Sequence, residues 1–223
     1  MDIIDKRLSL AEFADYVRTY DFGTQPANKL VIHHTWRPTK DSWAGERTIG
    51  GLKRYYEAKG WSAGPHLFIA EDGIWLFSPM RSDGIHAGSL NHRSIGMEVV
   101  GDYDAEVWSG MTKTNALGAI STLIKGLGIV QSDIYFHRDV AQKSCPGWAI
   151  TKAWLFAELG LAGATTSGPA GFSAPLPPVI PDWAAEAVTF VKTNNLFEVK
   201  TDADVRDAVK FHRFYKLIDS HYE

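Results

Sequence analysis

The chain has 223 residues, which is enough for one domain of ordinary size and a small additional unit. Hydrophobic residues make up 45% of the chain and charged residues 22%, which excludes a disordered, collagen-like or coiled-coil protein. The net charge of −3 argues against a strongly basic protein that binds nucleic acid, and no nucleic-acid partner is expected.

Helices and strands are predicted to alternate along the first 160 residues. In chain order, the sequence predicts a helix over 7–20, a strand over 29–35, a helix over 48–60, a hairpin over 66–79, a strand over 94–103, a helix over 115–128, a strand over 133–139 and a helix over 146–160. This alternation predicts an α/β domain in which one central sheet is covered by helices.

The composition changes after this region. Residues 160–181 contain much of the proline and glycine of the chain and no charged residue, which predicts a linker. Two short helices are expected within 182–223, and about forty residues are marginal as an independent fold. We therefore predict a main domain over 1–159, a linker over 160–181 and a small helical appendage over 182–223 that docks or self-associates.

The sequence pattern predicts neither a signal peptide nor a membrane-spanning helix. Acidic residues lie at the N-terminus, where a signal peptide has a basic start followed by an apolar stretch. No apolar run approaches the roughly 18 residues of a membrane-spanning helix. We expect synthesis in the cytoplasm, no membrane insertion, and release by another component if the protein acts outside the cell.

Three residues with metal-ligating side chains stand near the ends of predicted strands. His33 ends the strand over 29–35, His137 ends the strand over 133–139, and the only cysteine, Cys145, follows eight residues later. Strand ends are where α/β sheets build their sites. Two histidines and one thiolate would leave one zinc position for water, which is typical of a catalytic zinc site.

Cys145 also permits other interpretations. It stands just before the helix predicted over 146–160, where the helix dipole favours a thiolate. The residues alone are therefore compatible with a metal ligand, with the nucleophile of a Cys–His hydrolase, or with an inert buried cysteine. The single cysteine excludes an intramolecular disulfide.

Two charged residues and a group of aromatic residues are further candidates. Glu98 interrupts an apolar strand, so it lies either at an exposed edge or half buried with a raised pKa suited to a general base. Lys143 is either a solvated loop lysine or a cation that stabilises a developing oxyanion. Four tryptophans lie beside polar residues: Trp36, Trp43, Trp61 and Trp75. They are either core residues or the walls of a groove that stacks on sugars or peptides.

Five segments in order, VIHHT, GPHLFIAEDG, IHAG, NHRSIGMEVVG and FHRDVAQKSCPG, resemble the zinc-dependent N-acetylmuramoyl-L-alanine amidases of the second type. That family includes phage endolysins, cytosolic muropeptide-recycling amidases and peptidoglycan recognition proteins. The resemblance covers about residues 28–158. It implies a mixed sheet flanked by helices, with a zinc ion in an open groove.

The resemblance also implies roles for individual residues. His33, His137 and Cys145 match the zinc ligands, Lys143 matches the lysine that stabilises the transition state, and Glu98 matches the catalytic glutamate of the recycling branch. The residues expected to contact substrate are His66, His86, Trp36 and Asn91, whereas His34 and His92 have no assigned role.

One position departs from the family pattern. Phage-type members usually have a catalytic tyrosine just before the histidine of the hairpin strand, and here that position is Pro65. Either Glu98 is the only base, or the enzyme is slower, or Tyr55 or Tyr56 substitutes from the helix over 48–60. We favour Glu98.

The resemblance implies a peptidoglycan hydrolase that cleaves the amide between N-acetylmuramic acid and L-alanine with a zinc-activated water. We expect an endolysin of a phage or prophage, whose appendage binds the cell wall, the virion or a second copy. The alternatives are a non-catalytic peptidoglycan-recognition module, a metal-independent Cys–His amidase with Cys145 as nucleophile, and a structural tail component.

Overall fold

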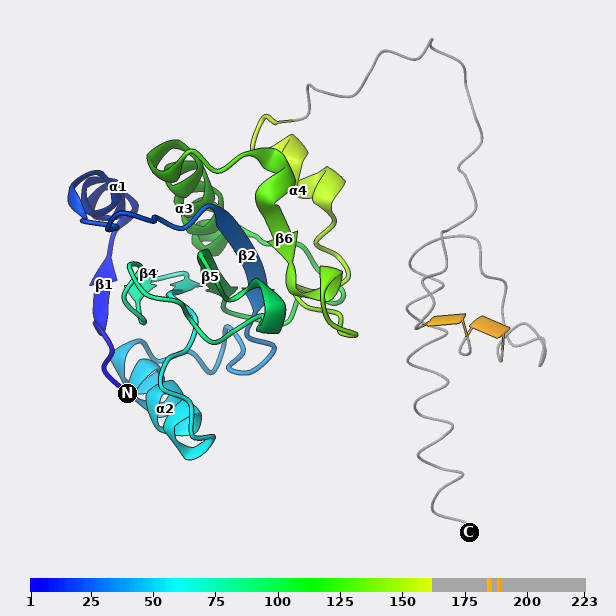
Figure 1. Ribbon diagram of the computed structural model, residues 1–223. Coiled ribbons are helices and arrows are strands. Elements are labelled where there is room, and N and C mark those ends of the chain that lie inside the picture. Colours follow the sequence, from blue (N-terminus) through cyan, green and yellow to red (C-terminus); the bar gives the residue numbers. More distant parts are fainter. Residues whose placement is uncertain (162–183, 186–187, 190–223) are drawn as a thin grey trace. The chain divides into compact units, whose positions relative to one another are not determined.

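The computed structural model describes residues 1–161, 184–185 and 188–189 (Figure 1). The chain forms two compact units, Met1–Thr165 and Thr166–Glu223. The four described residues of the second unit are helical. Nearly all of the linker predicted over 160–181, and most of the appendage predicted over 182–223, lie outside the described residues.

A six-stranded mixed sheet with the strand order β1-β4-β3-β5-β2-β6 forms the centre of the first unit. Its strands are β1 (Lys6–Leu8), β2 (Lys29–His34), β3 (Leu67–Ala70), β4 (Gly73–Leu76), β5 (Ser94–Val99) and β6 (Ile134–Phe136). Strands β1, β4 and β3 pair antiparallel, whereas β3, β5, β2 and β6 pair parallel. The α/β class with a mixed central sheet is therefore confirmed.

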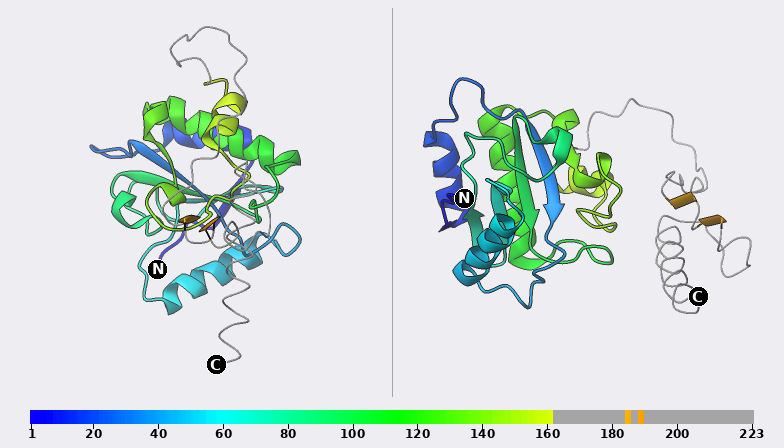
Figure 2. Two further views of the ribbon diagram at one scale, coloured as in Figure 1. Left: turned by 90° about the vertical axis from the view of Figure 1, so that its right-hand side faces the viewer. Right: turned by 60° about the horizontal axis from the view of Figure 1, so that its bottom comes forward.

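Helices cover the two faces of this sheet unequally. The helices are α1 (Leu10–Thr19), α2 (Glu46–Ala58), α3 (Gly110–Leu127) and α4 (Lys152–Glu158). Figures 1 and 2 show α1 and α3 on one face and α2 on the opposite face. The main core lies between the sheet and α1, α3 and α4, and every second residue of the strands points into it. Within the described residues, no helix has both the length and the hydrophobicity needed to cross a bilayer.

The other face carries a smaller core beneath α2. Ile49 and Tyr56 of α2 pack there against Phe68 of β3, Trp75 of β4 and the adjacent Phe77. The strand residues in this cluster come from β3 and β4. The same face of β5 and β2 instead carries polar residues, and the candidate site lies there.

The four helices of the first unit all start at residues other than the predicted ones. Helix α1 begins at Leu10 because Ser9 caps it: the Ser9 hydroxyl accepts from the Glu12 N–H at 3.3 Å, and the Glu12 carboxylate accepts from the Ser9 N–H at 2.8 Å. The residues before the cap form strand β1, which the sequence analysis missed.

The last helix of the first unit is shorter than predicted. Helix α4 begins at Lys152 rather than at residue 146, because the Thr151 hydroxyl caps it by accepting from the Trp154 N–H at 3.1 Å. Cys145 is therefore seven residues from a helix start, and the expected support of its thiolate by a helix dipole is wrong. Helix α3, in contrast, begins at Gly110, five residues earlier than predicted.

Candidate metal centre

His33 and Glu98 lie side by side on the sheet face that α1 and α3 leave uncovered. They are register partners in the neighbouring parallel strands β2 and β5. Because side chains alternate along a strand, Ile32 and Met97 point into the main core, and His33 and Glu98 point the other way. His33 is only 1% exposed.

Three side chains from separate segments converge at the carboxyl end of β2. His33 is the next-to-last residue of β2, His137 begins the 3-10 turn after β6, and Cys145 lies in the loop that follows. Their donor atoms all lie within 4.8 Å of one another. Nδ1 of His33 is 2.9 Å from Nδ1 of His137 and 3.6 Å from the sulfur of Cys145.

This donor set fits zinc. Zinc bonds of about 2.0–2.3 Å to nitrogen and sulfur, in tetrahedral arrangement, bring donor atoms to roughly 3.3–3.6 Å from one another. The sulfur to His33 distance lies in this range, and the two histidine nitrogens are slightly closer. Among the described residues the cluster has three donors, which leaves one tetrahedral position for another ligand.

The environment keeps both histidine rings neutral. Burial lowers the pKa of His33 well below its ordinary value, and His86, His137 and Lys143 lower it further. Burial and Lys143 lower the pKa of His137 to about 4. Neutral imidazole is the form that binds metals. Burial raises the pKa of the Cys145 thiol, so binding of a cation there releases a proton.

Glu98 is a buried carboxyl that is only partly satisfied. Its side chain is 14% exposed, and Oε1 lies 3.9 Å from Nδ1 of His33. Oε2 is buried and has no hydrogen-bond partner among the described residues. Burial raises the pKa of Glu98 to about 8, and the charge of Lys143 acts in the opposite direction. Such a perturbed carboxyl in a cluster of titratable groups is typical of functional sites.

The loop from residue 138 to residue 147 brings two cations to the cluster. Lys143 is exposed, and its charge lowers the pKa of both His33 and His137. Arg138 holds the loop in place, since its guanidinium donates to the carbonyl of Gly147 at 2.7 Å and its N–H donates to the carbonyl of Cys145 at 2.9 Å. The sequence analysis missed Arg138, although a cation directly after a candidate ligand was a usable signal.

His86 and Asn91 belong to the site in different ways. Nδ1 of His86 lies 3.1 Å from Nε2 of His33, on the side of that ring opposite the donor cluster. Oδ1 of Asn91 accepts from the N–H groups of His86 at 3.0 Å and of Ala87 at 2.7 Å. Asn91 therefore orders the loop that carries His86, and its expected contact with substrate stays a prediction.

His66 does not reach the surface of the site. It is fully buried. Nδ1 accepts from the Gly96 N–H at 2.9 Å, and Nε2 lies 2.9 Å from the Ser82 carbonyl, to which it must donate. The expected substrate contact of His66 is therefore wrong, because both ring nitrogens bond the protein backbone.

The two histidines without an assigned role lie outside the donor cluster. Nδ1 of His34 accepts from the Tyr103 N–H at 3.2 Å. His92 lies at the surface and pairs with Asp83 at 3.0 Å. Neither side chain belongs to the three-donor group.

The aromatic residues divide between core and surface. Trp75 is buried, and Trp61 stacks on Tyr56 with ring centroids 5.4 Å apart. Tyr56 is buried and close enough to Glu98 for that carboxylate to raise its pKa, whereas Tyr55 is 53% exposed. Trp36 lies two residues after the end of β2 and is 55% exposed, so its expected contact with substrate stays a prediction.

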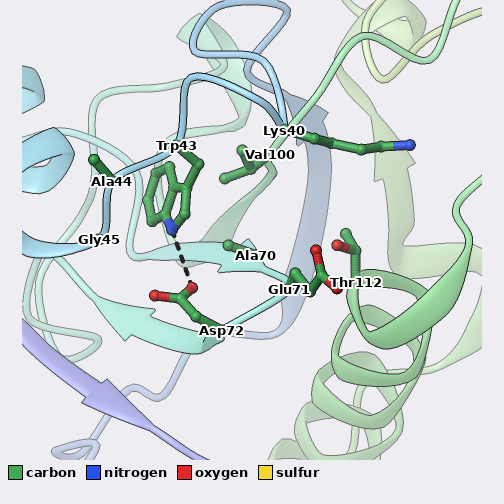
Figure 3. Close-up of a pocket in the computed structure, with 9 residues that line it drawn as sticks. All are labelled: Lys40, Trp43, Ala44, Gly45, Ala70, Glu71, Asp72, Val100 and Thr112. Atoms are coloured by element: carbon green, nitrogen blue, oxygen red, sulfur yellow. Dashed lines mark hydrogen bonds between the residues drawn. The ribbon is translucent and has the colours of Figure 1, made fainter.

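Trp43 lines a hollow of about 540 Å³ at the carboxyl ends of β3 and β5 (Figure 3). Its indole N–H donates to Oδ1 of Asp72 at 3.0 Å, which fixes the ring as one wall. Lys40, Glu71 and Thr112 supply polar groups around it. None of the three donor residues lines this hollow, so it is separate from the candidate metal centre.

The chain is similar in sequence to several known proteins. A family model described as N-acetylmuramoyl-L-alanine amidase matches residues 23–148, a span that includes all three donors and Glu98. Peptidoglycan-recognition protein SC2 of Drosophila melanogaster is 30% identical over 144 residues, which are 59% of this chain and 77% of that protein. The endolysin of Enterobacteria phage T3 is 28% identical over 113 residues, which are 48% of this chain and 75% of that protein.

Solved structures of similar fold include the endolysin amidase LysCS from Clostridium intestinale. It superposes with a TM-score of 0.51 and 26% identity, over 63% of this chain and 87% of that one. Drosophila peptidoglycan recognition protein SD has the same fold, with a TM-score of 0.52 and 20% identity over 60% of this chain and 81% of that one.

Proposed function

The chain belongs to the N-acetylmuramoyl-L-alanine amidase family, and we propose that it hydrolyses the amide between N-acetylmuramic acid and L-alanine in peptidoglycan, with zinc held by His33, His137 and Cys145. One observation carries this proposal: three donors from separate segments meet beside the partly unsatisfied carboxyl of Glu98. A three-donor set with an open position suits a hydrolytic zinc site better than a structural one.

His33, His137 and Cys145 would hold the zinc ion, which would supply a Lewis acid to polarise the scissile carbonyl and acidify water. Glu98 removes a proton from the attacking water as the carbon–oxygen bond forms. Lys143 stabilises the negative charge that develops on the carbonyl oxygen. Glu98 then gives its proton to the leaving nitrogen as the carbon–nitrogen bond breaks, which leaves a lactyl carboxylate on the sugar and a free amino group on the alanine.

The pKa of Glu98 supports this assignment. With no cation bound, burial raises the pKa to about 8. A cation held a few ångströms away favours the carboxylate and lowers that pKa toward the operating pH. A carboxyl whose pKa lies near the operating pH both accepts and returns a proton efficiently.

The alternative of a metal-independent Cys–His amidase is disfavoured by the surroundings of Cys145. Burial raises the pKa of its thiol, whereas a nucleophile needs the thiolate. The nearest following helix, α4, begins only at Lys152, so its N-terminus does not stabilise a negative charge on the sulfur. The His34 N–H, Lys143 and Arg138 lower the pKa of this thiol, but burial outweighs them, and a bound cation would favour the thiolate further.

We also propose that the protein acts as a lytic enzyme of the phage endolysin kind, released from the cytoplasm to the cell wall. Supporting this proposal, the endolysins of Enterobacteria phage T3 and Escherichia phage T7 are each 28% identical to this chain over about half its length. The same donor set is compatible with a bacterial amidase. The peptidoglycan digestion described below tests the amidase reaction in either case.

Digestion of purified peptidoglycan tests the proposed reaction. New amino groups and new reducing sugar ends are measured in parallel, with zinc, with a chelator, and after zinc is added back. Amino groups that appear only with zinc, without new reducing ends, support the amidase.

Three other results would contradict it. New reducing ends would indicate glycosidase activity, and cleavage that survives chelation would indicate Cys145 as nucleophile. Binding of peptidoglycan without any cleavage in the zinc-loaded protein would indicate a recognition module, for which the absent tyrosine at Pro65 is the natural explanation.

A further inference from the structure

We propose that His86 and Ser94 are positioning residues. They fix the tautomer of the neutral His33 ring, so that the lone pair on Nδ1 faces the donor cluster. This inference rests on the proposed metal centre but not on the proposed substrate. It concerns which ring nitrogen of His33 carries the proton before any cation binds. The neutral ring has two forms, and only the form with its proton on Nε2 can ligate through Nδ1.

Three consecutive hydrogen bonds lead away from His33 into the protein. Nε2 of His33 lies 3.1 Å from Nδ1 of His86, and Nε2 of His86 lies 3.3 Å from the Ser94 hydroxyl. The Ser94 hydroxyl lies 2.5 Å from the carbonyl of Leu90, and the carbonyl of Asn91 is a second neighbour at 3.3 Å.

The chain of bonds has only one consistent direction. It ends at a backbone carbonyl, which can only accept, so the Ser94 hydroxyl donates to it. That hydroxyl therefore accepts from Nε2–H of His86. His86 then has no proton on Nδ1, so this nitrogen accepts from Nε2–H of His33. Nδ1 of His33 is left with a free lone pair 2.9 Å from His137 and 3.6 Å from Cys145.

The surrounding residues hold His86 in this position. A Cβ atom built on Gly96 would lie 2.5 Å from the His86 ring, so the ring occupies space that only glycine leaves open. Asn91 accepts from the His86 N–H and fixes the backbone of its loop. Ser94 and Gly96 alternate with residues of the main core, so they share the face of β5 that carries Glu98.

Without His86, nothing among these contacts prevents His33 from carrying its proton on Nδ1, toward the other donors. The ring would then have to change its protonation before binding a cation. Hydrogen-bond partners of metal-ligating histidines typically change metal affinity by about 10–100-fold when they are removed. We expect His86→Ala to lose zinc affinity in that range.

Zinc affinity, measured by competition with a chromophoric chelator, is the first test. His86→Asn places an amide oxygen near the position of Nδ1, so it should recover much of the affinity that His86→Ala loses. Ser94→Ala should weaken zinc binding by a smaller factor. Ser89→Ala, an exposed serine in the 3-10 turn after His86, is the matched control and should leave affinity unchanged.

Nitrogen NMR of the zinc-free protein, wild type and His86→Ala, is a second test that does not depend on metal binding. We expect the proton of His33 on Nε2 in the wild type and a mixture of the two forms in His86→Ala. A proton on Nδ1 in the wild type would overturn the inference, as would His86→Ala that binds zinc with wild-type affinity. If wild-type protein binds zinc in the expected form yet does not cleave peptidoglycan, the proposed function fails and this inference stands.

Discussion

Nδ1 of His33 lies 3.9 Å from Oε1 of Glu98, because the two residues are register partners in neighbouring parallel strands. The sheet itself therefore sets the separation between a candidate metal ligand and the candidate base. Strands are among the most rigid elements of a fold, and sites built on rigid elements hold their geometry best. A change at either residue can be tested without disturbing a flexible loop.

Replacing the proposed base should remove catalysis and leave zinc binding intact. Glu98→Gln keeps the shape of the side chain but cannot accept a proton, so we expect kcat to fall by about 10²–10⁴-fold. Amide hydrolysis and zinc content are measured on the same sample. Glu46→Gln, an exposed glutamate in the first turn of α2, is the control and should retain activity. Wild-type turnover by Glu98→Gln would remove Glu98 from the mechanism.

Zinc should stabilise the folded protein as well as activate it. A ligand present at 100 times its Kd stabilises the state that binds it by about 2.7 kcal/mol. We expect a chelator to lower the Tm and zinc to restore it. Cys145→Ser should lose most of this zinc-dependent shift, whereas Cys145→Asp should keep part of it, because carboxylate oxygens also ligate zinc. A wild-type Tm that does not respond to zinc would contradict the metal centre.

Loss of the lysine near the cluster should affect the chemical step more than substrate binding. Lys143 is not one of the three donor residues. Its positive charge nevertheless lowers the pKa of His33, His137 and Glu98. We expect Lys143→Ala to lower kcat by about 10–10³-fold with little change in KM. Lys125→Ala, at an exposed position in the last turn of α3, is the matched control. An effect of Lys143→Ala on KM alone would instead assign it to substrate binding.

Arg138 should support both the fold and the metal centre. Its guanidinium donates to the carbonyls of Ser144, Gly147 and Ile150. Ser144 directly precedes Cys145, and the other two residues follow it within five positions. Hydrogen bonds to charged groups contribute about 1.5–3 kcal/mol each and are not additive. We expect Arg138→Lys, which cannot reach several carbonyls at once, to lower the free energy of unfolding by roughly 2 kcal/mol and to weaken zinc binding. Denaturant unfolding of the zinc-free protein separates the two effects, and unchanged stability would refute this role.

His66 should make the zinc-free protein sensitive to acid. Burial lowers its folded-state pKa to about 4, below the ordinary value of 6.5, so the unfolded chain binds more protons between these limits. Stability is therefore fully present above about pH 6.5 and is lost as the pH falls toward 4, by about 3 kcal/mol from this group.

Denaturant unfolding at a series of pH values measures this loss. His66→Gln has no titrating group at this position, so its stability should depend less steeply on pH between 6.5 and 4 than that of the wild type. NMR titration of His66 in the wild type checks the low pKa directly. Equal slopes for the two proteins, or a pKa near 6.5, would contradict the argument.

Local patterns predicted the alternation of helices and strands, the α/β class and the three donors that gather at the site, whereas the mixed sheet was implied by the family resemblance. Apolar runs such as 29–35 and 133–139 end at histidines, and chain geometry alone places such ends at one edge of a parallel sheet. Residue type then limits the chemistry, because two histidines and a cysteine suit zinc. The alternation of elements and the meeting of the three donors were predictable because they depend on periodicity and strand order, whereas the identity of the metal stays a prediction.

The tertiary structure decided which side chains face the cluster and which face the backbone. The sequence analysis expected both His66 and His86 to contact substrate. In the structure, His66 bonds two backbone groups, whereas His86 bonds His33. Glu98 was recognisable in the sequence as a carboxylate within an apolar strand, but which loop packs over that face of β5 was not. Strand pairing and loop packing join residues far apart in the chain, and no local pattern specifies those contacts.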